Sequence, residues 1–239
     1  MKSICIIPVY NEIDQLESLI DKITKTKDKN QIEFMIVDNG STDGSSNIIK
    51  KSGIQFVKLN KNFGVGYALI KGLQFAIKNK FEIIVHLAGN GKMEPKEIRN
   101  FLRLIKYNNY DFVNGSRFLV GGNYKSNPLF RIIAIKLLSL FMSMLFRKKL
   151  TDVTCGFRAF KVSIFKKSHK LFNHKRFFTY RYEYYTYGKV LINHKLKVCE
   201  TPVSMKYKKK NYSKIRPIID WLPIILGYLE ALLDGKKIT

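Results

Sequence analysis

The first 116 residues alternate short apolar runs with segments of helical periodicity, and this alternation constrains the fold more than any other feature. The apolar runs predict strands at Ser3–Ile7, Glu33–Val37, Gln55–Lys58, Ile83–Leu87 and Phe112–Asn114. The segments between them predict helices near Glu12–Thr26, Ser45–Lys51, Val65–Lys80 and Pro95–Tyr107. Such alternation is typical of a mainly parallel sheet with helices on both faces. The sequence therefore predicts an α/β fold that binds its ligands at the carboxyl ends of the strands.

The size and composition of the chain limit its class. A length of 239 residues with 46% hydrophobic residues allows one α/β domain with a sizeable core and excludes disorder. No cleavable signal peptide is expected, because the apolar run after Met1 is short and no small-residue cleavage site follows it. The three cysteines, Cys5, Cys155 and Cys199, are widely spaced and odd in number, so they favour neither a disulfide framework nor a zinc site. A cytoplasmic protein fits these features.

The net charge of +25 is large and unevenly distributed. Lysine and arginine far outnumber the acidic residues between Arg147 and Arg216. Such a field attracts phosphate-rich partners, which are nucleic acids, anionic membranes or phosphorylated substrates. A lysine-rich proteome is the alternative explanation for the total charge. We expect no nucleic-acid partner, because no known nucleic-acid-binding module is visible.

Two apolar segments follow the alternating part. Leu129–Phe146 is almost uniformly apolar but contains Arg131 and Lys136, which predicts a buried or interfacial helix rather than a membrane span. Pro217–Leu233 predicts an amphipathic helix. Its apolar face carries Ile218, Trp221, Leu222, Ile225, Leu229 and Leu232. That second helix either docks on the domain or lies on a membrane.

Three polar loops lie at the ends of predicted strands. The first contains Pro8-Val9-Tyr10-Asn11-Glu12, and the second runs from Asp38 to Ser45 with Asn39 and two glycines. An aspartate at a strand end can accept the N–H of a uracil or guanine base. The third loop, Asn60–Gly66, opens a helix with two glycines, whose amide groups could bind a diphosphate or a ribose. Each motif alone would also suit an ordinary turn and helix cap.

These loops belong to an ordered series of motifs that resembles the family 2 glycosyltransferases with the GT-A fold. The resemblance extends from Met1 to about Arg216 and is strongest to the dolichyl- or polyprenyl-phosphate sugar synthases. The later motifs are Asn62-Phe63-Gly64-Val65-Gly66-Tyr67-Ala68, Gly115-Ser116-Arg117-Phe118 and Asp152-Val153-Thr154-Cys155-Gly156-Phe157-Arg158-Ala159. The resemblance implies that the nucleotide is bound by Pro8, Tyr10, Asn11, Glu12, Asp38, Asn39 and Gly64.

The resemblance also implies an organisation and a reaction. Residues 1–116 would form the nucleotide-sugar-binding half, residues 117–215 the acceptor-binding half, and residues 216–239 a C-terminal amphipathic helix associated with the membrane. The enzyme would move a sugar from a nucleotide-sugar, UDP rather than GDP, to a polyprenyl phosphate with inversion. It would be peripheral on the cytoplasmic face of the cell membrane, whose anionic surface would be a further partner.

Two positions depart from the family pattern. The second motif has Asp38-Asn39 where the family has two aspartates, and the metal-binding D-x-D has become Ala88-Gly89-Asn90. A Mg²⁺ or Mn²⁺ ion needs hard anionic oxygens, and Asn90 offers only a neutral amide. Lys92 could instead place an ammonium group near the leaving diphosphate. Three alternatives stay open: a metal-independent enzyme, a metal held elsewhere, and a noncatalytic nucleotide-sugar- or membrane-binding module.

The candidate catalytic residues are therefore Asn90, Lys92 and Arg117. The resemblance implies an acceptor site made of Arg117, Arg131, Asp152, Arg158 and Lys214. A phosphate acceptor is already anionic and needs no strong base, so catalysis would consist of positioning and charge neutralisation. A saccharide acceptor, used in cell-surface polysaccharide synthesis, would need a carboxylate base that the sequence does not reveal. Glu183 is expected only to brace the acceptor loop, and His86 to be packed.

Overall fold

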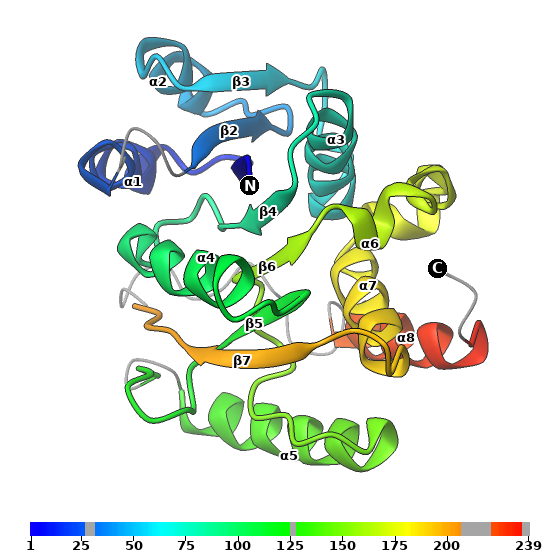
Figure 1. Cartoon of the computed structure of the whole chain (residues 1–239). Helices are drawn as coiled ribbons and strands as arrows, with labels where there is room; N and C mark the ends of the chain where they lie inside the picture. The colour runs from blue at the N-terminus through cyan, green and yellow to red at the C-terminus, as the bar shows by residue number, and fades with distance from the viewer. Residues whose placement is uncertain (27–31, 125–127, 207–220, 236–239) are drawn as a thin grey trace.

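A computed structural model describes residues 1–26, 32–124, 128–206 and 221–235. Its described strands form one sheet in the order β3-β2-β1-β4-β6-β5-β7 (Figure 1). The strands are β1 Ser3–Val9, β2 Glu33–Asp38, β3 Gln55–Lys58, β4 Ile83–His86, β5 Phe112–Ser116, β6 Arg158–Lys161 and β7 Val198–Pro202. Strand β6 is antiparallel to both of its neighbours, whereas the other pairs are parallel. The mainly parallel α/β sheet expected from the sequence is confirmed.

The helices alternate with the first five strands as expected. They are α1 Ile13–Thr26, α2 Ser45–Lys51, α3 Val65–Lys78, η1 Pro95–Glu97, α4 Ile98–Lys106, α5 Leu129–Phe146, α6 Ser163–Lys166, η2 His169–Asn173, η3 Lys175–Phe178, α7 Arg181–Ile192 and α8 Trp221–Leu233. The helix expected over Pro95–Tyr107 begins as a single 3₁₀ turn with Pro95 at its start. Strands β6 and β7 were not expected, because each is short and contains polar residues.

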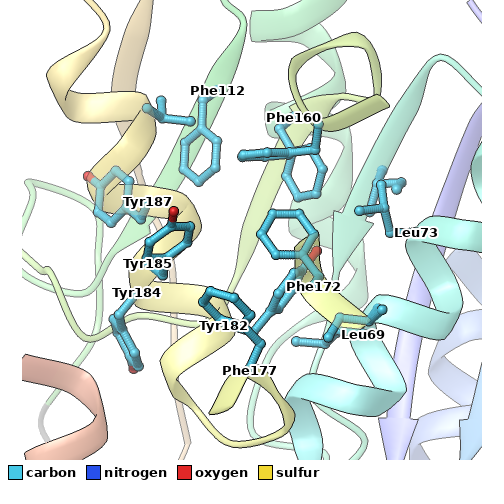
Figure 2. Packing of buried hydrophobic residues seen from close by; sticks show 14 of the residues in the cluster. Leu69, Leu73, Phe112, Phe160, Phe172, Phe177, Tyr182, Tyr184, Tyr185 and Tyr187 are labelled. Carbon is cyan, nitrogen blue, oxygen red and sulfur yellow. The ribbon is translucent and has the colours of Figure 1, made fainter. Parts of the chain in front are cut away.

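Alternating side chains of the strands build a separate core on each face of the sheet. Cys5 and Ile7 of β1 face helices α1, α2 and α4, whereas Ile4 and Ile6 face α3 and α7. The second core is rich in aromatic rings. Figure 2 shows Phe112 of β5, Phe160 of β6 and a series of tyrosines from α7 gathered near Leu69 and Leu73 of α3. The sheet is therefore covered on both sides, and its open end is left for ligands.

Helix α5 lies at the border of the molecule and buries little of its surface (Figure 1). Ile135, Ser139, Met142 and Phe146 are its buried residues, and they lie three or four positions apart on one face. Among the described helices it alone is long and apolar enough to cross a membrane, with a mean hydropathy of 2.0 and 22% of the segment buried. In the described part of the chain, α5 is thus an apolar helix that packs against the domain through one narrow face only.

Helix α8 docks on α7, which was one of the two alternatives for this segment. A Cβ atom at Gly227 would lie 3.0 Å from the carbonyl oxygen of Arg181, so the two helices approach closely. The hydroxyl of Tyr228 donates to the carbonyl of Val153 at 2.8 Å. The apolar face expected from the sequence is only partly covered: Trp221 and Leu232 are half-buried, whereas Leu222 is 58% exposed and Leu229 is 37% exposed, and Ile218 lies outside the described residues. Docking therefore uses the face that carries Gly227.

Candidate active site

Hydrogen bonds join the loops that follow β1 and β2. Asn11 adopts a left-handed conformation with φ of 52°, and its side-chain oxygen accepts the backbone N–H of Thr42 at 2.8 Å. The backbone N–H of Asn11 donates to the hydroxyl of Ser41 at 3.1 Å. Asn11 therefore holds the two loops together. If its side chain also contacts the nucleotide, as predicted, it does so while its oxygen accepts the hydrogen bond from Thr42.

The loop after β3 is attached in the same way. The Asn39 amide donates to the Asn62 side chain at 2.8 Å, and its oxygen accepts the N–H of Phe63 at 3.1 Å. Gly64 follows with φ of 97°, and a Cβ at Gly66 would collide with the carbonyls of Phe177 and Thr179. Asn39 and Gly64 thus belong to loops that hydrogen bonds join to each other. Gly66 has to be a glycine because the backbone of Phe177 to Thr179 leaves no room for a side chain.

Asp38 has a different place from the one expected. It is fully buried, with one carboxylate oxygen accepting the N–H of Ser41 at 2.9 Å and the other accepting the hydroxyl of Ser46. Both oxygens are engaged, and the side chain does not line the cavity described next. In this structure Asp38 fixes the turn that presents Asn39.

A cavity of about 630 Å³ lies at the carboxyl ends of β1 and β4. Its first part is lined by the strand-end loops, and its far part by helices α5, α7 and α8. The lining consists of Pro8, Val9, Tyr10, Glu12, Asn39, Asn62, Gly64, Val65, Leu69, His86, Leu87, Ala88, Gly89, Asn90, Lys92, Met93, Arg117, Arg131, Ile135, Thr154, Gly156, Thr179, Tyr180, Glu183, Tyr184, Met205, Trp221 and Ile224. Residues that the sequence assigned separately to donor and acceptor thus border one continuous space.

The segment after β4 lies between this cavity and a smaller one of about 230 Å³. Asn90 and Lys92 line both. The N–H of Lys92 donates to the side-chain oxygen of Asn90 at 3.2 Å, which closes a tight turn through Gly91. The two predicted catalytic residues are therefore held together at the junction of the cavities.

Two ion pairs of Glu94, one with Lys22 and one with Lys206, lie next to this turn and were not predicted from the sequence. Glu94 is 8% exposed and binds the ammonium groups of Lys22 at 3.3 Å and Lys206 at 3.2 Å. Burial would raise the pKa of Glu94, but hydrogen bonds from Lys206 and Lys22 outweigh burial and lower it. The N–H of Lys206 also donates to the carbonyl of Lys92 at 3.0 Å. Two further lysines are therefore fixed next to Lys92.

The residues at this turn do not suit a divalent cation. Mg²⁺ and Mn²⁺ are bound through carboxylate and other oxygen ligands, whereas Ala88 offers no side-chain oxygen and Asn90 only a neutral one. Among the described residues, no group of three or more His, Cys, Asp and Glu side chains is arranged to hold a metal ion. The donor set therefore does not fit the metal that the family pattern implies.

Arg117 and Asp152 form a buried ion pair at the cavity. The Arg117 Nε donates to one oxygen of Asp152 at 2.6 Å, and Nη2 donates to the other at 2.7 Å. Arg117 is 3% exposed and Asp152 is fully buried. Arg117 lines the cavity, but Asp152 does not. Asp152 therefore orients Arg117 from behind the lining of the cavity.

Arg158 is also placed differently from the prediction. Its guanidinium is 2% exposed, donates to Asn114 at 3.0 Å and to the carbonyl of Glu183, and lies over the rings of Tyr184 and Tyr187 at 4.9 and 4.8 Å. It does not line the cavity. A buried arginine needs this many acceptors and rings to offset its desolvation. Arg158 is thus a core residue that joins β5, β6 and α7.

Two buried titratable side chains, Glu183 and His86, line the base of the cavity, and His86 is packed as expected. Glu183 is 7% exposed, and burial raises the pKa of its carboxyl, although the charge of Arg158 opposes the shift. His86 is 4% exposed, and its Nε2 has no hydrogen-bond partner among the described residues. Burial and the Arg158 charge lower the pKa of His86 to about 3, so the ring is neutral at physiological pH. Glu183 lies in the first turn of α7, and no sequence pattern indicated that its carboxyl would border the cavity.

Most predicted site residues do meet at the cavity. Pro8, Tyr10, Glu12, Asn39, Gly64, Asn90, Lys92, Arg117 and Arg131 line it. Asn11 lines the smaller neighbouring cavity. Asp38, Asp152 and Arg158 lie behind the lining, and Lys214 is outside the described residues. Trp221 and Ile224 of α8 complete the far wall and were not assigned to the site from the sequence.

The family model described as glycosyl transferase family 2 matches residues 4–168, which is more than half of the chain. The chain belongs to this family. It is therefore a glycosyltransferase, and the cavity that joins the strand-end loops to α5 is its candidate active site. The resemblance inferred from the sequence motifs is confirmed.

Two curated relatives name the subgroup. The chain is 23% identical over 172 residues to polyprenol monophosphomannose synthase of Mycolicibacterium smegmatis, with 70% of this chain and 64% of that protein covered. It is 27% identical over 253 aligned positions to UDP-N-acetylglucosamine–dolichyl-phosphate N-acetylglucosaminyltransferase of Methanococcus voltae, with 98% of this chain and 96% of that protein covered. Both names describe sugar transfer to a polyprenyl-type phosphate.

A solved structure supports the fold of this glycosyltransferase. Glucosyl-3-phosphoglycerate synthase from Mycobacterium tuberculosis, in complex with Mn²⁺, UDP and glucosyl-3-phosphoglycerate, matches with a TM-score of 0.68 and 16% identity. The match covers all of this chain and 81% of the other. The GT-A fold expected from the motifs is thereby confirmed.

Proposed function

We propose that this glycosyltransferase moves a sugar from a nucleotide-sugar to a polyprenyl phosphate, with inversion, at the cytoplasmic face of the membrane. One observation carries the proposal: a single cavity extends from the strand-end loops to Arg131 and Ile135 of the exposed apolar helix α5. A substrate with a phosphate head and a hydrocarbon tail matches a cavity that has a cation and an apolar helix at one end. The named relatives support the same class of acceptor.

The donor nucleotide would occupy the part of the cavity formed by the loops after β1, β2 and β3. Tyr10, Glu12 and Asn39 line this part, and the loops are fixed to one another by the hydrogen bonds of Asn11 and Asn39. A preformed edge of this kind binds with little loss of conformational freedom. We take UDP as the preferred nucleotide over GDP.

Transfer would need charge neutralisation at the diphosphate but no metal ion. An oxygen of the acceptor phosphate attacks the anomeric carbon from the side opposite the leaving group, and the bond from that carbon to the diphosphate oxygen breaks. The electron pair stays on the diphosphate, whose negative charge Lys92 would stabilise from the junction of the two cavities. Arg117 and Arg131 would hold the acceptor phosphate at the attacking distance.

A product assay tests the function directly. We expect purified protein with a panel of UDP- and GDP-sugars and undecaprenyl phosphate to form one glycosyl-lipid, detected by mass, and to form it from a UDP-sugar. The stereochemistry of the product at the anomeric carbon would report inversion. Binding of the nucleotide-sugar without any product, with lipid or saccharide acceptors, would contradict the proposal and indicate a noncatalytic binding module.

A second candidate function has an observation in its favour. A hydroxyl acceptor needs a base, and Glu183 supplies a buried carboxyl that lines the cavity and has a raised pKa. A raised pKa brings a carboxylate closer to the range where it accepts protons effectively at neutral pH. The enzyme could therefore act on a saccharide hydroxyl in cell-surface polysaccharide synthesis.

Glu183→Gln separates the two acceptors. We expect the variant to keep its rate with polyprenyl phosphate within about tenfold, because an anionic phosphate needs no base. With a saccharide acceptor it should lose 100-fold or more, the usual contribution of a general base. In that case the wild-type rate would also rise with pH through the raised pKa of Glu183, since only the ionised form accepts a proton. Steady-state kinetics across pH with both acceptors, beside Glu82→Gln as an exposed control, would decide.

A further inference from the structure

The outer side of α5 is an exposed apolar surface that no described part of the chain covers. Its large side chains are between 38% and 71% exposed, and they follow one another along the whole helix. They are Leu129, Phe130, Ile133, Leu137, Leu140, Phe141, Met144 and Leu145. Soluble proteins rarely expose so many neighbouring apolar side chains unless these side chains bind another molecule or a membrane.

A groove with a strong positive charge opens beside the C-terminal half of this helix. It has a volume of about 670 Å³ and is lined by Phe118, Lys136, Ser139, Leu140, Ser143, Met144, Arg147, Lys148, Lys149, Leu150 and Thr151. The lining contains four cations and no acidic residue. None of the four cations forms an ion pair with a residue that the structure describes. Lys148 is half-buried, and this burial lowers the pKa of its ammonium group.

The groove and the apolar surface are continuous. Leu140 and Met144 line the groove and are 59% and 65% exposed, so they also belong to the apolar side of α5. A ligand bound here would meet cations at one end and hydrocarbon at the other. Anionic phospholipids have this distribution of charge and apolar surface, whereas a free phosphate would leave the apolar part uncovered.

We propose that this groove binds the headgroup of an anionic phospholipid, and that α5 thereby lies along the surface of an anionic membrane. Lys136, Lys148 and Lys149 would contact the lipid phosphate, and the outer side chains of α5 would enter the boundary of the acyl chains. The groove is separate from the candidate active site, although both use α5.

This inference rests on the proposed function, and it specifies how the enzyme would be oriented on the membrane. The N-terminal half of α5 presents Arg131 and Ile135 to the active-site cavity, while the C-terminal half forms the lipid groove. A helix anchored in this way would keep the mouth of the cavity at the depth where the phosphate of a membrane-bound polyprenyl phosphate lies. The groove would thus raise the activity toward acceptors in a bilayer without entering the chemistry.

Vesicle flotation tests the groove. We expect the wild-type protein to float with vesicles of phosphatidylcholine and phosphatidylglycerol, and to bind vesicles of phosphatidylcholine alone much more weakly. The triple variant Lys136→Gln, Lys148→Gln, Lys149→Gln should bind the anionic vesicles roughly 100-fold more weakly, since each lysine near an anionic surface contributes about a fivefold gain in affinity. The control Lys50→Gln, Lys51→Gln, Lys58→Gln removes the same charge from exposed positions on α2 and β3, and should retain most of the binding.

Equal binding of the two triple variants, with both folded by circular dichroism, would overturn the groove as a lipid site. A wild-type protein that is dimeric without lipid, and becomes monomeric on Leu137→Ser with Phe141→Ser, would overturn it in favour of a second copy covering α5. A short water-soluble polyprenyl phosphate distinguishes failure of the groove from failure of the function. The lysine variant should process this acceptor at the wild-type rate and lose activity only toward the acceptor in vesicles.

Discussion

Activity is expected to persist in EDTA, and Lys92→Ala is expected to lower kcat/KM by roughly 100- to 1,000-fold, the loss seen when one preorganised group is removed from a developing anion. The reason is the chemistry of the turn after β4, where Ala88 and Asn90 replace acidic ligands and Lys92 lies at the junction of the two cavities. In the proposed mechanism, the Lys92 ammonium neutralises the charge of the leaving diphosphate in place of a metal ion. Initial rates with EDTA, Mg²⁺ and Mn²⁺ measure this dependence.

The matched control for this prediction is Lys96→Ala, which removes the same charge from an exposed side chain four residues further along the chain. It should leave kcat/KM within about twofold, because exposed charges are screened by solvent and salt. A wild-type enzyme that is silent in EDTA and restored by Mn²⁺ would contradict a metal-independent mechanism. Unchanged kinetics of Lys92→Ala would exclude the lysine as the neutralising group.

The second large effect concerns the ion pair behind the cavity. Asp152→Asn is expected to reduce the free energy of unfolding by about 3–5 kcal/mol, the typical result of leaving one partner of a buried pair uncompensated. The asparagine amide cannot accept the two hydrogen bonds that Arg117 donates at 2.6 and 2.7 Å. Arg117 would also lose its orientation, so the KM for the acceptor should rise. Urea denaturation and acceptor titrations measure the two consequences.

Asp21→Asn provides the comparison, because Asp21 and Lys25 form an exposed pair at 2.7 Å on α1. Breaking an exposed pair of this kind changes stability by less than about 1 kcal/mol. If Asp152→Asn is as stable as Asp21→Asn, the Arg117 pair does not hold this part of the fold. If the KM for the acceptor is unchanged in a folded Asp152→Asn variant, Arg117 is not positioned by the pair.

Local patterns were sufficient to predict most of the sheet. The strands before residue 117 and the helices between them depend on periodic apolar residues, and the structure places them within a few positions of the expected bounds. Strands β6 and β7 were missed because they are short and polar residues interrupt them. Their pairing depends on residues far away in the chain, so a local pattern carries little information about them.

The site could be predicted by position but not by role. The motifs correctly predicted that Asn39, Lys92 and Arg117 meet at one cavity, because strand ends meet at one edge of a sheet. It could not show that Asp152 turns inward to Arg117. Whether a charged side chain faces a ligand or a buried partner is decided by tertiary packing. For the same reason Glu94, which holds two lysines, had no visible signal in the sequence.

The single antiparallel strand also affects how the chain folds. Strand β6 is inserted between β4 and β5, with Ile84 and Phe112 both paired to Phe160. The part of the sheet formed by β1 to β4 therefore ends in an unpaired apolar edge until β6, a segment made much later in synthesis, arrives. An exposed edge of this kind is prone to aggregate, and contacts between distant segments form slowly. The parts of the sheet before and after β4 should consequently fold as one cooperative unit rather than in succession.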